Sequence, residues 1–235
     1  MAAYARREQK WASARGSADQ RSAALQGLAQ AAQMRGDLGA ALAFARQSVE
    51  LAVDAGVRLS IGINQWDVAE ALGAAGDLAG ARAALEASVR ALEGSALQGF
   101  RAEARTRLAR TLVTQGDLGE ARRQAELARA EVGPDDSLTI ATAAWALAVV
   151  CAAEGRPDDA GRLYQEARER IGLTGYLLTD MNIQRDYARF LIETGRPAEA
   201  RPLLEEVRAF YDTPETSFER ERTEALLQRC AAVPR

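Results

Sequence analysis

The sequence predicts an all-α fold, a right-handed superhelical solenoid of antiparallel helix pairs with about twelve helices. A six-residue segment recurs along the 235-residue chain, and its glycines are 40, 40, 39 and 40 residues apart. Helical patterns of roughly 15 to 20 residues flank each copy, and β-branched runs with a period of two are absent. A period near 40 residues is typical of helical arrays. The copies are GDLGAA (36–41), GDLAGA (76–81), GDLGEA (116–121), GRPDDA (155–160) and GRPAEA (195–200).

A helix is expected on each side of every repeat glycine. Glycine lacks Cβ and can adopt the left-handed conformation that ends a helix. Aspartate follows the glycine in three copies and is expected to cap the next helix, whereas proline in the other two suits a first helical turn. First helices are predicted at 18–35, 60–75, 96–115, 136–154 and 177–194, and second helices at 37–55, 77–92, 117–132, 157–171 and 197–211.

Two further positions hold alanine in all five copies. Small side chains at one level of a helix pair let the two backbones approach closely, at the low end of the usual range of about 8 to 10 Å. Packing therefore explains these alanines without any chemical role. They stand seven residues before the glycine (29, 69, 109, 148 and 188) and five residues after it (41, 81, 121, 160 and 200).

The pattern predicts a single array over residues 1–235, with an odd helix at each end. Residues 3–15 occupy a second-helix position with no first helix before them, which fits either a capping helix or the terminal portion of a longer protein. Residues 216–228 occupy a first-helix position, where the spacing of Thr216 and Glu219 is that of a capping box. The divisions are 1–16 (odd helix), 17–56, 57–96, 97–135, 136–175 and 176–213 (repeats), and 214–235 (capping helix and tail).

Charge and hydropathy argue against nucleic acid and membranes as direct partners. The net charge is −3, from 30 basic and 33 acidic residues that are interspersed, so the electrostatic footprint of nucleic-acid binding is missing. The N-terminus carries charges where a signal peptide needs an apolar segment, and the longest uncharged run, 138–153, is too short to span a membrane. We expect a cytoplasmic protein whose two cysteines are reduced thiols.

Catalysis finds little support in the sequence. The chain has no histidine, which removes the commonest general base and metal ligand. It also has no glycine-rich phosphate loop and no cysteine cluster, and its carboxylates are scattered. We therefore expect no enzymatic activity, no metal and no cofactor.

The three fixed positions resemble the tetratricopeptide repeat, which places a small residue in the first helix, glycine seven residues later and alanine five after that. Three departures are evident: the period exceeds the family's usual 34 residues, the leading tryptophan position holds other residues, and the closing proline is missing. HEAT repeats have about this length and are the alternative, but they do not explain the three positions held in register. The resemblance implies a concave face lined by the first helices, and a protein or peptide as partner.

Candidate binding residues are expected on that face, along the stripe of positions ten, six and three residues before each glycine, and those chosen stand ten or six residues before it. Tryptophan and arginine are common at interface hot spots, and unpaired arginines would favour an acidic peptide or a carboxylate terminus. Trp145 could equally be a core residue, and the arginines could instead pair with Glu70, Glu103 or Glu193. The candidates are Gln26, Gln30, Trp66, Glu70, Thr106, Arg110, Trp145, Arg185 and Arg189.

Two functional hypotheses follow. The first is a non-catalytic scaffold that binds a peptide or helix of a partner protein in its concave groove, with self-association through the end helices left open. The second is the sensory or regulatory C-terminal array of a larger bacterial signalling ATPase, cyclase or transcription regulator. Residues 186–212 look similar to the repeat tails of bacterial signal-transduction ATPases and cyclase fusions. An ATPase or cyclase domain encoded in frame before Met1 would favour the second hypothesis.

Overall fold

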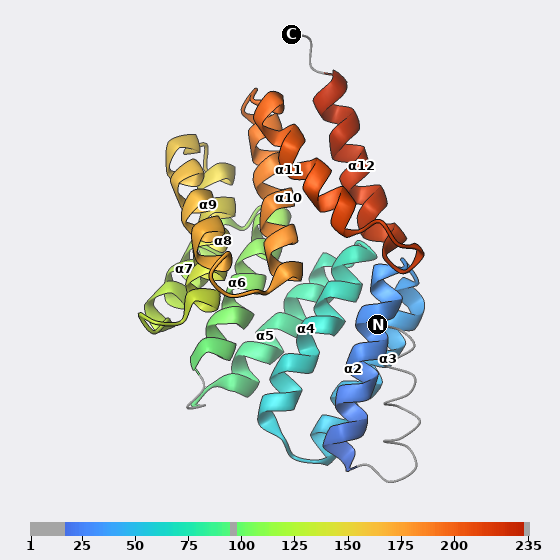
Figure 1. The fold of residues 1–235 in the computed structure, drawn as a ribbon. Helices are drawn as coiled ribbons and strands as arrows, with labels where there is room; N and C mark the ends of the chain where they lie inside the picture. The colour runs from blue at the N-terminus through green and yellow to red at the C-terminus, as the bar shows by residue number, and fades with distance from the viewer. Residues whose placement is uncertain (1–16, 95–97, 233–235) are drawn as a thin grey trace.

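The computed structural model describes residues 17–94 and 98–232, and within these ranges the secondary structure is entirely helical. Eleven α-helices and one short 3-10 helix are present in this part of the chain, and the expected N-terminal helix lies outside it (Figure 1). The all-α expectation is confirmed. The helices are α2 (Ala18–Met34), α3 (Leu38–Asp54), α4 (Arg58–Ala74), α5 (Leu78–Leu92), α6 (Gln98–Gln115), α7 (Leu118–Glu131), α8 (Ser137–Ala153), α9 (Pro157–Ile171), α10 (Leu177–Glu193), α11 (Pro197–Phe210), η1 (Pro214–Thr216) and α12 (Ser217–Ala232).

The repeat turns have the predicted geometry. All five glycines have positive φ, between 73° and 86°, which residues with a Cβ rarely adopt. The side chains of Asp37, Asp77 and Asp117 accept hydrogen bonds from backbone N–H groups three residues later, as helix caps do. Pro157 and Pro197 begin α9 and α11.

The ten repeat alanines are all buried, which confirms their packing role. They lie between paired helices together with larger apolar side chains such as Leu85, Leu112 and Leu204. Consecutive helices pack on one another along the chain, from α2 against α3 to α11 against α12. These contacts form one continuous solenoid, and both cysteines in its interior are free thiols.

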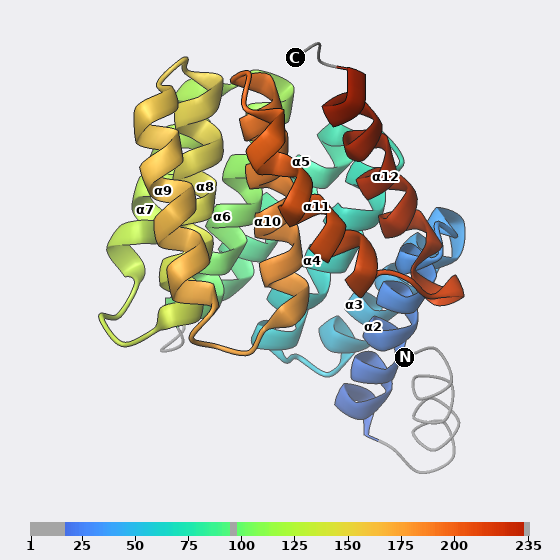
Figure 2. The same cartoon turned by 45° about the horizontal axis from the view of Figure 1, so that its top comes forward.

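The two ends of the described solenoid meet. The chain curls so that α12, drawn in red, returns beside α2, drawn in blue (Figures 1 and 2). Both α12 and η1 contact α2. A Cβ placed on Gly36, at the end of α2, would lie 3.3 Å from the Phe218 ring. The concave face is therefore enclosed by the array's own C-terminal helix.

The predicted capping box at the start of α12 is wrong. Thr216 lies in η1, and its hydroxyl donates to the backbone carbonyls of Tyr211 and Thr213. The Glu219 side chain instead forms ion pairs with two arginines. An ion pair within the fold has replaced the local cap that the spacing indicated.

Candidate functional site

A cavity of about 780 Å³ lies inside the curl of the solenoid. Its wall is built mainly from the first helices α2, α4, α6, α8 and α10, together with α12. Because the ends of the array meet, helices from the two ends, α2 and α12, contribute to the same wall. The volume falls within the range of about 300 to 1,000 Å³ usual for ligand sites.

Most of the predicted residues line this cavity, and two do not. Thr106 is only 1% exposed, and its hydroxyl donates to the Glu103 carbonyl within its own helix. Its short side chain is used locally and does not reach the cavity. Arg189 lines a smaller pocket beside α12. The predicted residues that line the cavity are Gln26, Gln30, Trp66, Glu70, Arg110, Trp145 and Arg185.

Both tryptophans serve the core and the cavity wall together. Trp145 is 6% exposed and packs in the C-terminal core, while its indole N–H donates to Asp186 at 3.0 Å. Trp66 is partly buried, and its indole N–H donates to Ser88 at 2.9 Å. An arginine covers each ring, with the Arg110 guanidinium carbon 3.5 Å from the Trp145 ring centroid. The indoles hold arginines in place through cation–π contact.

Arg107 covers Trp66 and belongs to an ion-pair cluster. Its guanidinium carbon lies 4.9 Å from the indole centroid, and its nitrogens pair with Glu70 and Glu103. These are two of the three carboxylates considered from sequence as partners of the candidate arginines. In the structure both carboxylates pair with Arg107, which lies three residues before Arg110 on the same helix.

Arg110 has no ion pair with any residue that the structure describes. Its Nε atom is buried and lacks a hydrogen-bond acceptor. Burial, with a smaller effect of neighbouring Arg107, lowers the pKa of Arg110, although an arginine stays charged in proteins. Arg110 therefore stacks on Trp145 without a direct ion pair to a described residue, and the charges of Glu103, Asp186 and Glu70 nearby partly offset the effect of burial on its pKa.

Asp67 is the acidic counterpart on α4. It is 6% exposed, and its Oδ1 atom accepts a hydrogen bond from the Gln30 amide at 3.1 Å. Its Oδ2 atom is buried without a partner. Burial, reinforced by the charge of Glu70, raises the pKa of Asp67 to about 7. The group can therefore exist in either protonation state near neutral pH.

Sequence reasoning missed Asp67, Glu103, Arg107, Asn182 and Asp186, all of which line the cavity. A signal for them was available. They stand nine or thirteen residues before a repeat glycine, and positions 13, 10, 9 and 6 before it follow the i, i+3, i+4, i+7 spacing of one helical face. The predicted stripe was too narrow to include these two rows.

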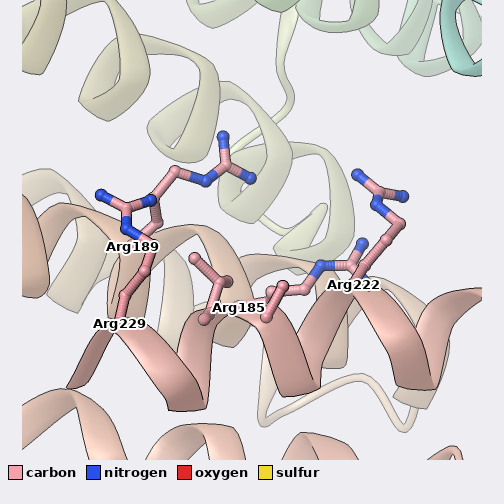
Figure 3. A pocket seen from close by; sticks show the side chains of 6 residues that line it. Arg185, Arg189, Arg222 and Arg229 are labelled. Atoms are coloured by element: carbon pink, nitrogen blue, oxygen red, sulfur yellow. The ribbon is translucent and has the colours of Figure 1, made fainter. Parts of the chain in front are cut away.

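A smaller pocket of about 270 Å³ lies between α10 and α12 and is lined by four arginines. Figure 3 shows Arg189 and Arg229 together at one end, Arg222 at the other and Arg185 between them. Each is paired. Arg185 and Arg222 share Glu219, Arg189 pairs with Asp186, and Glu193 lies 3.6 Å from Arg229. Within the described residues, no group of histidine, cysteine or acidic side chains could hold a metal ion.

Comparison with known proteins identifies the repeat. A tetratricopeptide repeat model matches residues 139–213, and a second one matches residues 102–126. These two matches identify tetratricopeptide repeats in this part of the chain. HEAT repeats are thereby set aside, and the longer period is a variation within the tetratricopeptide fold. No curated protein matches the chain significantly at the sequence level.

Solved structures agree on the fold. The chain is similar to the nearly identical tetratricopeptide-like repeats of a Podosopora anserina protein assigned to the kinesin light chains, with 23% identity and a TM-score of 0.55. The match covers 80% of this chain and 93% of the Podosopora anserina chain. The protein in that crystal structure is a variant of the repeats. A second crystal structure of the repeats has a TM-score of 0.54 and the same identity. At this identity the likeness concerns the solenoid fold alone. No helix in the described ranges is long and apolar enough to cross a membrane.

Proposed function

We propose that this tetratricopeptide array is a non-catalytic interaction module that binds a segment of a partner protein in its central cavity. Tetratricopeptide arrays generally bind protein partners, which supports the class of partner. The observation that carries the proposal is the cavity itself, whose wall combines tryptophan-supported arginines with amide and carboxylate side chains. Such residues provide directional contacts to a peptide backbone and its side chains.

The closed shape favours a short segment over a long helix. Contact between α12 and α2 limits the length that could lie across the concave face. We therefore expect a loop or chain end of the partner to enter the cavity. A cytoplasmic location and self-association through the end helices stay predictions.

A sensory array is the second candidate. The same enclosure gives the cavity a size that suits a small effector molecule. An in-frame ATPase or cyclase domain before Met1 would favour this function, because such a domain could transmit the occupancy of the cavity.

A steric block tests the first candidate. Thr114 is exposed and lines the cavity, and its hydroxyl bonds only to the Arg110 carbonyl in its own helix. Thr114→Trp should fill part of the cavity without removing a core contact. Ala130→Trp on α7, exposed and away from the cavity, is the matched control.

The partner would be captured from native lysate on the wild-type array, identified by mass spectrometry and then purified. We expect the wild-type array and Ala130→Trp to bind it equally, and Thr114→Trp to weaken binding at least tenfold. Equal binding by all three proteins would show that the partner uses another surface.

A further inference from the structure

The smaller pocket between α10 and α12 has a wall that is cationic and apolar. Two arginines from each helix line it, and Ala225 and Leu226 form the rest of its wall (Figure 3). Among the described residues, no acidic side chain lines it. The carboxylates that pair with its arginines therefore lie outside the surface that a ligand would contact. We call this space the arginine pocket, and its arginines are Arg185, Arg189, Arg222 and Arg229.

The ion pairs of these arginines leave positive charge and N–H donors available. Arg185 and Arg222 share the single carboxylate of Glu219, so one charge of the two is not neutralised by it. Glu193 lies 3.6 Å from Arg229, which is too far for a hydrogen bond. A further acceptor in the pocket can therefore be bound without breaking the existing pairs.

Three of the four side chains are accessible, and the fourth is fixed. Arg185 is only 6% exposed and is held by Glu219 and by the side-chain oxygen of Asn182. The side chains of the other three arginines are between 43% and 49% exposed. A ligand can therefore reach their guanidinium groups from solvent without any change in the core.

Stability does not explain why the four arginines converge. Arg189 and Arg222 pair with acidic residues three positions earlier on their own helices, and such pairs form equally well on the outer surface of a helix. Guanidinium groups that point into one pocket repel one another instead. An anion between them replaces this repulsion with attraction.

We propose that the arginine pocket binds a phosphate group, either as free phosphate or as the end of a phosphate monoester. A planar guanidinium can donate two parallel hydrogen bonds to phosphate oxygens, and here guanidinium groups come from two helices. The volume of about 270 Å³ lies just below the usual range of about 300 to 1,000 Å³ for whole ligands, which suits a small anion better than a peptide. This inference does not rest on the proposed interaction function.

Phosphate in this pocket joins α10 to α12. Helix α12 also contacts α2 and thereby encloses the central cavity. Arg185 and Arg222 line both the arginine pocket and that cavity. A phosphate held by both helices therefore stabilises α12 in its closed position, so the arginine pocket is a regulatory site for access to the cavity.

Isothermal titration calorimetry on the full chain tests the ligand, with inorganic phosphate and phenyl phosphate as the two probes. Sodium chloride holds the ionic strength constant, so that general screening does not differ between titrations. Binding of inorganic phosphate would support the free anion, and binding of phenyl phosphate alone would support a monoester. If neither probe binds, the proposal is overturned.

Variants assign the site. Arg189→Gln and Arg229→Gln each remove one accessible guanidinium, from α10 and α12 respectively, and should weaken binding at least tenfold. Arg229→Lys keeps the charge without the planar fork and should bind with intermediate affinity, which also provides a milder variant if a glutamine form unfolds. Arg208→Gln, exposed on α11 and outside the pocket, should bind like the wild type. Wild-type affinity in both glutamine variants would show that the anion binds elsewhere.

Amide hydrogen exchange tests the effect on closure. The probe that binds should slow exchange in α12 and α2 of the wild type, because it holds α12 against α10, and should have no such effect on Arg229→Gln. Binding that leaves exchange in α12 unchanged would reject the arginine pocket as the site.

Discussion

At the scale of single residues, Asp67 links the cavity to the stability of the fold. Its pKa is raised from 3.8 to about 7, first by burial and then by the charge of Glu70, while the Gln30 and Gln26 amides and Arg107 oppose the rise. Between these two pH values the folded state binds more protons than the unfolded state, so stability falls as pH increases. The contribution of Asp67 is complete below pH 3.8 and is lost as pH rises through about 7.

Asp67→Asn should remove this part of the pH dependence. Between pH 5.5 and pH 8 the wild type should lose about 2 kcal/mol of unfolding free energy through Asp67, and the variant should not, because an amide does not titrate. The carbonyl oxygen of the new amide can still accept from Gln30. Urea unfolding at the two pH values measures the difference, with Asp54→Asn, an exposed position on α3, as the control. A variant that keeps the wild-type pH dependence would show that Asp67 titrates normally.

Helical periodicity predicted which positions face the cavity, but not which contacts the individual side chains make. Counting back from each glycine identified seven cavity residues, because a helix presents fixed positions on one face. The same count could not tell that Thr106 would use its hydroxyl within its own helix. It also could not assign Glu70 and Glu103 to Arg107 instead of Arg110, since neighbouring positions on one face differ only in where long side chains reach.

At the scale of elements, the turn chemistry accounts for the success of the helix prediction. Glycine with positive φ ends one helix and an aspartate or proline starts the next, so both boundaries follow from a short turn. Local signals were weaker at the two ends of the array. At α12, the pairing of Glu219 with Arg185 on α10 overrode the capping pattern.

The close approach of paired helices can be tested on α7. Ala121 is fully buried in the core between α6 and α7, so Ala121→Leu should force side chains apart and cost about 1 to 3 kcal/mol. Gly119 lies on the same helix, and a Cβ there would meet nothing within 4 Å. Gly119→Ala should therefore stabilise the protein by about 0.4 to 1 kcal/mol, because it restricts the unfolded chain. Thermal unfolding of both variants gives the two signs, and an unchanged Ala121→Leu would contradict the tight packing.

At the scale of the whole molecule, closure decides what the cavity can hold, and closure could not be derived from the repeat. The curvature of a solenoid accumulates from small rotations between successive repeats. The sequence pattern defines the register of each repeat but not that rotation. The return of α12 to α2 became visible only in three dimensions.

Phe218→Ala tests this closure directly. Phe218 packs against Gly36 at the end of α2 and is partly buried, so its loss should cost about 1 to 2 kcal/mol, less than the roughly 3 to 5 kcal/mol of a fully buried phenylalanine. We expect a larger radius of gyration in small-angle X-ray scattering and faster amide exchange in α2. Phe210→Ala, at the end of α11 and away from α2, should leave both measurements unchanged. If the ring stays closed without Phe218, the other contacts of α12 and η1 with α2 suffice, and the cavity is a permanent feature of the array.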